Sequence, residues 1–253
     1  MSKSRIPLGY DSSPSSHAMP WREYVLLACY HLRLLNWWLY ALMLLGFLGS
    51  CAIFWLQIRT GTIESIHQGD SLSRFILETG AGLISGALAS TLVIGDPLLE
   101  ISMATRTGIL RILLWRYLLT CLTLFVCSVA YLGWTLHFGA TYTQQQSPLS
   151  LLLVWLAPVA LLSMLSMLGA FFTCNATLGA TLSIIPLVAD VFLHDELLSI
   201  AAMRPIFIPY TYWAHDAPDW WVNRLTLLGI AGTLALCSWW RLRHEEHLLS
   251  DAR

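Results

Sequence analysis

Six long apolar stretches constrain the fold of this chain more than any other feature of its sequence. They cover residues 38–58, 77–94, 112–134, 149–173, 175–194 and 225–240. A helix needs about 20 mostly apolar residues to cross the hydrocarbon core of a bilayer, and each stretch approaches that length. The sequence therefore predicts an all-α polytopic membrane protein with six transmembrane helices.

The composition agrees with a lipid environment. Only 11% of the 253 residues are charged, and 57% are hydrophobic. Soluble domains carry about 25% charged residues, so this chain has too few to cover a water-facing globule. Its formal net charge is −1, which excludes the concentrated basic face of a nucleic-acid-binding protein. We expect the bilayer, and no nucleic acid, among its partners.

The fourth and fifth stretches are nearly continuous, with a break only at Thr173-Cys174-Asn175. We expect two helices joined by a tight turn. The alternative is a single kinked helix, whose length would be roughly twice one bilayer crossing.

The distribution of Lys and Arg predicts the orientation, because cytoplasmic loops are enriched in both residues. An even number of spans places both termini on one side, and we assign that side to the cytoplasm. It receives nine basic residues against four on the other side, and Arg116 lies within the third span. The nine are Lys3, Arg5, Arg22, Arg33, Arg106, Arg111, Arg241, Arg243 and Arg253.

The ends of the chain differ from its membrane domain, 38–240. Residues 1–20 are polar and rich in Ser and Pro, and we expect a flexible cytoplasmic tail without a cleavable signal peptide. Residues 21–37 alternate apolar and charged positions at helical spacing, which predicts an amphipathic helix at the inner membrane surface. A continuation of the first span is the alternative. Residues 241–253 form a charged cytoplasmic tail.

Small side chains recur every four residues along the second span. One row is Ala81, Ser85 and Ala89, and the next is Gly82, Gly86 and Ser90. Such rows let helix backbones approach closely in lipid. We expect this helix in the centre of the bundle or at a subunit interface.

The chain has no phosphate loop, no zinc-protease motif and no nucleophile elbow. Its six cysteines contain no CxxC pair, and the two closely spaced histidines, His244 and His247, lie in a charged tail. We therefore expect no catalytic centre, no metal site and no cofactor in this chain.

A few polar residues lie at membrane depth: Glu78, Arg116, Asn175 and Asp190. Ionisable groups are costly in lipid and are often functional there. Alternatively, Glu78 and Arg116 lie near span ends and simply pair or reach the interface. We expect Asp190 to be in water near the outer surface. No acidic relay of the kind a proton-driven carrier needs is evident at mid-depth.

Residues 86–100, followed by Thr105, Arg106, Arg111 and Arg116, resemble the second span and following cytoplasmic helix of permease subunits of type-2 ATP-binding cassette (ABC) exporters. Residues 220–225 and 240–249, which open and close the last span, are a second point of likeness. The resemblance extends over nearly the whole chain beyond the N-terminal tail.

The resemblance implies a cytoplasmic coupling helix at about 96–107, which receives force from a separate ATPase. The acidic residues Asp96 and Glu100 suit the positive end of a helix dipole, and Gly108 offers a stop. An ordinary loop between spans is the alternative. The candidate residues for coupling to the ATPase are Asp96, Glu100, Thr105 and Arg106.

The outer loop, about 195–223, is rich in proline and aromatic residues. In the resembled family, this region contains short re-entrant helices that cap the exit. We expect its aromatic side chains at the outer headgroup level. Heme handling near His215 is an alternative interpretation.

The expected function is that of a permease subunit without a nucleotide site of its own. ATP and Mg²⁺ would bind the partner ATPase, and the conduit would form between two permease copies, either identical or sister chains. Weaker candidates for its lining are Glu78, Ser85 and Asn175. We expect a plasma-membrane location, in the cytoplasmic membrane of a bacterium. The alternatives are a membrane scaffold or assembly factor and a secondary carrier.

Overall fold

The computed structural model describes residues 37–60, 66–93, 109–138, 142, 147–214 and 217–251. All regular secondary structure in these residues is helical. The chain divides into two units, Met1–Trp37 and Trp38–Arg253, and the second contains every described residue except Trp37. The predicted tail 1–20, nearly all of the predicted amphipathic helix 21–37 and the predicted coupling helix 96–107 lie outside the described residues.

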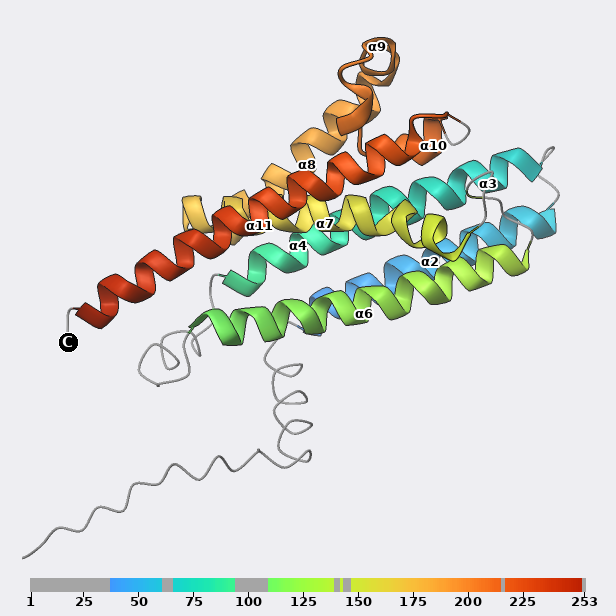
Figure 1. Cartoon of the computed structure of the whole chain (residues 1–253). Helices are drawn as coiled ribbons and strands as arrows, with labels where there is room; N and C mark the ends of the chain where they lie inside the picture. The colour runs from blue at the N-terminus through green and yellow to red at the C-terminus, as the bar shows by residue number, and fades with distance from the viewer. Residues whose placement is uncertain are drawn as a thin grey trace, which may run out of the picture. The chain divides into compact units, whose positions relative to one another are not determined.

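Five long helices, α2, α4, α6, α7 and α11, run roughly along one common direction in Figure 1. The elements in chain order are α2 (Trp37–Thr60), α3 (Ile66–Phe75), the π-helix η1 (Ile76–Gly80), α4 (Ala81–Val93), α6 (Ile109–His137), α7 (Pro148–Thr173), α8 (Ala176–Phe192), α9 (His194–Ser199), the 3-10 helix η2 (Arg204–Ile206), α10 (Tyr210–Ala214) and α11 (Trp220–Asp251).

Within the described residues, four helical segments are long and apolar enough to cross a membrane: Ser71–Leu92, Leu113–His137, Pro148–Thr173 and Trp220–Arg243. Two shorter apolar helices, Leu44–Thr60 and Ala176–Phe192, coincide with the first and fifth predicted spans. The chain is therefore an all-α membrane protein. The 17 residues of α8 rise about 26 Å, slightly less than the hydrocarbon thickness of a typical bilayer.

Helix α7 lies at the centre of the described bundle and packs against α4, α8 and α11. The small residues of the second predicted span allow α4 to approach α7 and α8 closely, as predicted. A methyl group added at Gly82 would lie 2.7 Å from Leu162 of α7, and one at Gly86 would lie 2.5 Å from Ser183 of α8. Ser166 of α7 also donates a 2.6 Å hydrogen bond to the carbonyl of Gly86.

The turn between α7 and α8 confirms the predicted break and excludes a single kinked helix. Cys174 adopts a left-handed backbone conformation with φ of 50°, which ends α7. The Asn175 side chain then caps α8 by accepting hydrogen bonds from the backbone N–H groups of Thr177 and Leu178. The two helices pack against each other directly beyond this turn.

The segment that connects α8 and α11, residues 193–219, folds into the short helices α9, η2 and α10. Helix α11 begins at Trp220, five residues before the predicted span start at residue 225. The apolar pattern misses this first turn because it contains Asn223 and Arg224, which are buried by polar contacts instead of apolar ones.

The sequence suggested that the aromatic residues of this region lie at the surface. In the structure, only some of them do. Tyr210 and Trp220 are buried, and Trp213 is exposed. Tyr210 and Trp220 therefore do not face lipid, because both side chains have polar partners inside the protein, and the depth of these residues in the membrane stays a prediction.

The close contact between α7 and α8 leads to a prediction at Gly179. Its added methyl group would lie 2.7 Å from the backbone oxygen of Ser166 and 2.8 Å from the backbone nitrogen of Ala170, so the helices must separate. We expect Gly179→Ala to lower the unfolding free energy by about 1–3 kcal/mol, measured as a lower thermal midpoint in detergent. The control is Gly232→Ala in α11, where nothing lies within 4 Å. Equal midpoints for both variants would contradict the packing.

Candidate functional site

A buried ion pair between Glu78 and Arg224 joins the candidate membrane helices Ser71–Leu92 and Trp220–Arg243. Glu78 lies in η1, and Arg224 lies in the first part of α11, 146 residues further along the chain. Both side chains are fully buried, at 0% exposure. A charge in such surroundings is stable only when it is paired and hydrogen-bonded, so the pair holds these two helices together.

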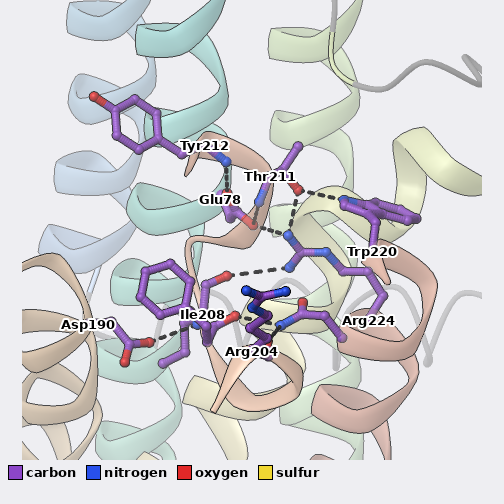
Figure 2. A network of polar contacts seen from close by, with 10 residues as sticks. Glu78, Asp190, Arg204, Ile208, Thr211, Tyr212, Trp220 and Arg224 are labelled. Carbon is purple, nitrogen blue, oxygen red and sulfur yellow. Dashed lines mark hydrogen bonds and ion pairs between the residues drawn. The ribbon is translucent and has the colours of Figure 1, made fainter. Parts of the chain in front are cut away.

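The short helix α10 completes the coordination of the Glu78 carboxylate, as Figure 2 shows. The backbone N–H of Thr211 donates to one carboxylate oxygen and that of Tyr212 donates to the other, each at 3.0 Å. The Thr211 hydroxyl accepts hydrogen bonds from Arg224 at 2.5 Å and from the Trp220 indole at 3.0 Å. We call these five residues, Glu78, Thr211, Tyr212, Trp220 and Arg224, the Glu78 cluster.

The π-helical turn explains how the candidate span Ser71–Leu92 presents Glu78 to α10. Residues Ile76–Gly80 form five π-helical residues between α3 and α4. A π turn inserts an extra residue into the helix, and such turns occur frequently at functional sites. Beside it, the rings of Phe75 and Tyr212 lie 5.2 Å apart in an edge-to-face contact. The turn and α10 therefore meet through both polar and aromatic contacts.

Further hydrogen bonds fasten the connecting segment to α8 and α11. The Asn223 amide donates to the carbonyls of Arg204 and Phe207, at 2.7 and 2.8 Å. The N–H of Ile208 donates to the Asp190 carboxylate at 2.7 Å. Figure 2 shows this carboxylate beside Ile208 and away from the Glu78 carboxylate. The segment is thus attached at several points along its length.

Tyr210 adds one more attachment, a 2.5 Å hydrogen bond from its hydroxyl to the carboxylate of Asp219. Burial, followed by this hydrogen bond, raises the pKa of Tyr210 above its ordinary value. The phenol therefore remains protonated at neutral pH and acts as a hydrogen-bond donor.

The predicted site residues fall into two groups. The coupling candidates Asp96, Glu100, Thr105 and Arg106 lie outside the described residues. Of the lining candidates, Glu78 is in the buried pair, and Ser85 is 1% exposed and donates to the carbonyl of Val159 in α7. Asn175 is exposed and caps α8. The structure brings none of these three together.

The sequence analysis missed Thr211 and Arg224 as partners of Glu78. One signal was present: a lone acidic residue at membrane depth calls for a cation, and Arg224 lies at the start of another span. The contribution of α10 had no such signal, because its donors are backbone N–H groups that every sequence has.

The described residues contain no candidate metal site. No group of three or more His, Cys, Asp or Glu side chains there could hold a metal ion. His215 and the side chains of His244 and His247 lie outside what the structure describes.

Comparison with known proteins gives no assignment: no family model, no curated protein and no solved structure matches this chain.

The Glu78 cluster leads to a stability prediction. Glu78→Gln leaves the Arg224 charge buried without a counter-ion, so we expect a loss of about 3–5 kcal/mol, measured by thermal unfolding in detergent. The control is Glu196→Gln in α9, which makes the same charge change at an exposed position and should leave the midpoint unchanged.

A charge swap tests the role of α10. In Glu78→Arg combined with Arg224→Glu, the two charges remain paired, but an arginine replaces the acceptor of the Thr211 and Tyr212 N–H groups. We therefore expect the swap to remain as unstable as Glu78→Gln. Recovery of wild-type stability would mean that the ion pair alone matters.

Proposed function

We propose that this chain is the membrane-spanning permease subunit of a type-2 ABC exporter. A separate subunit hydrolyses ATP, and two permease copies form the translocation pathway between them. The observation that carries the proposal is the Glu78 cluster, which holds the short helix α10 against two candidate membrane helices. Those helices contain or border both sequence stretches that resemble the exporter family, residues 86–100 and 220–225.

The Glu78 cluster lies on a continuous helical segment that leads toward the proposed coupling helix, and this position supports the proposal. Elements η1 and α4 follow each other without interruption from Ile76 to Val93. The proposed coupling helix, 96–107, comes three residues later. A push on that helix from the ATPase would therefore reach α4 first and act, at its far end, on the contacts between Glu78, α10 and α11.

The mechanism is a two-state shift. Binding of ATP closes the nucleotide subunits, and the bundle moves between inward-facing and outward-facing arrangements. Buried polar contacts suit such a shift because the members of a hydrogen-bond network strengthen one another and are made or broken together. In this chain the Glu78 cluster is the set that would change, and no residue of the chain performs chemistry.

A scaffold or assembly factor is the competing function. It has no need of an ATPase, and changes in 96–107 would uncouple nothing. A secondary carrier is the other alternative, and it would also be recovered without a nucleotide-binding partner.

The proposal includes six spans, an amphipathic surface helix at 21–37 and both termini in the cytoplasm of a bacterial cell. In that arrangement α8 crosses the membrane, with Cys174 inside and α9 outside. We expect Cys174 to react with a membrane-impermeant maleimide only after permeabilisation, measured in spheroplasts. The other five cysteines, Cys29, Cys51, Cys121, Cys127 and Cys237, are changed to Ser in this background. The exposed Ser199, changed to Cys, should react at once.

The outcome separates three arrangements. Immediate reaction at Cys174 and delayed reaction at residue 199 would mean that the orientation is reversed. Equal behaviour at both positions would mean that α8 does not cross the membrane.

The decisive test is purification of the tagged chain from native membranes in gentle detergent, with counting of every co-purifying protein. We expect a soluble ATPase in near-equal amount, and its loss when Glu100→Ala and Arg106→Ala are combined. The control combines Arg59→Ala and Glu196→Ala, which remove the same two charges at exposed positions on the opposite predicted side. Recovery of the chain alone, or with partners that lack nucleotide sites, would favour the scaffold or carrier.

A further inference from the structure

A cavity of about 300 Å³ lies between α7, α8 and α11. Each helix lines it with two residues four apart, which share one helix face. The connecting segment contributes further apolar side chains, including Phe207 and Ile208. The six helix residues are Leu161, Leu165, Pro186, Asp190, Ile230 and Leu234. The volume is at the lower end of the range for small-molecule sites.

Asp190 is the single ionisable residue among those that line the cavity. One of its oxygens, Oδ2, accepts the hydrogen bond from Ile208. Within the described residues, the other oxygen accepts none, and no Lys, Arg or His forms an ion pair with the carboxylate.

Three basic residues of the neighbouring elements, His194, Arg204 and Arg224, are engaged elsewhere. His194, one turn beyond Asp190, stacks on the ring of Trp213 at 3.8 Å and lies 3.2 Å from Asp195. Arg224 pairs with Glu78, and Arg204 donates to the carbonyl of Leu198. The Asp190 carboxylate thus lacks the counter-ion that Glu78 has, although it faces an apolar cavity.

We propose that this cavity binds a small lipophilic organic cation, with Asp190 as its counter-ion. The carboxylate attracts an ammonium group, and the leucine and isoleucine walls accept a hydrophobic body. A metal ion does not fit the lining, because Ca²⁺ and Mg²⁺ require several oxygen ligands and the other lining residues have apolar side chains. The ammonium group can belong to a free amphiphile or to a lipid headgroup.

The inference goes beyond the proposed transport cycle, because it concerns a site made by one copy of this chain. Its test needs neither an ATPase nor a second subunit. A failure to bind the cation would therefore not affect the conclusion from co-purification of an ATPase. Absence of an ATPase would likewise not affect the conclusion from cation binding.

The test is equilibrium dialysis of the full-length chain in maltoside detergent with radiolabelled 4-phenylbutyl-trimethylammonium. The comparison ligand is its neutral analogue, in which carbon replaces nitrogen. We expect the wild-type protein to bind the cation at least about tenfold more tightly than the neutral analogue, because only the cation is attracted electrostatically to the carboxylate. Equal binding of the two ligands would overturn the proposal, and this comparison needs no variant.

Two variants locate the site. Asp190→Asn retains an oxygen that accepts from Ile208 and removes the charge, so the preference for the cation should disappear. Glu196→Gln also removes one negative charge, at an exposed position in α9, and should alter nothing. Ile230→Trp should weaken binding of both ligands because it fills the cavity. Unchanged cation binding by Asp190→Asn would also overturn the proposal.

Competition with phosphatidylethanolamine identifies the source of the ammonium group. Displacement of the probe would assign the site to a lipid headgroup, and retention of the probe would assign it to free amphiphilic cations. Either result supports the site, provided that the wild-type preference for the cation is present.

Discussion

The ion pair between Glu78 and Arg224 is the interaction on which the arrangement of η1, α10 and the start of α11 depends. Each charge alone would be costly to bury, and together they still need hydrogen bonds to their remaining polar atoms. Glu78 obtains these from the backbone of α10, and Arg224 obtains one from the Thr211 hydroxyl. The fold of the connecting segment is therefore part of the ion pair, since α10 supplies donors that no side chain in the cluster replaces.

A different kind of contact holds the middle of the bundle. There, α4, α7 and α8 approach through glycine, alanine and serine, with a hydrogen bond from Ser166 to the Gly86 carbonyl. Close packing of this kind favours movement as a rigid unit, because a small shift would bring backbone atoms into collision. Helix α4 belongs to both regions, because it packs against α7 along its length and continues into η1 at Glu78.

The sequence predicts the parts of this fold that follow from apolar surface. Among the described residues, it indicates the four long apolar helices, the α7–α8 turn at Cys174 and the close packing at Gly82 and Gly86. It does not predict the burial of Trp220 or the early start of α11, because both depend on polar partners from distant segments. A hydropathy pattern predicts which residues are buried away from water, but it does not predict the hydrogen-bond or ion-pair partner of each buried polar group.

Of the two carboxylates near the connecting segment, Glu78 has a buried counter-ion, and Asp190 has none within the described residues. A single residue, Ile208, lies between their contacts. Ile208 donates its N–H to Asp190, and its carbonyl accepts a 3.5 Å hydrogen bond from Arg224, the partner of Glu78. A cation bound by Asp190 would draw on the same carboxylate that holds Ile208. Movement of Ile208 would then alter a contact of Arg224. If the cavity binds a cation, its occupancy would be linked to the Glu78 cluster through this single residue, and in the proposed exporter that link would connect ligand binding to the position of α10.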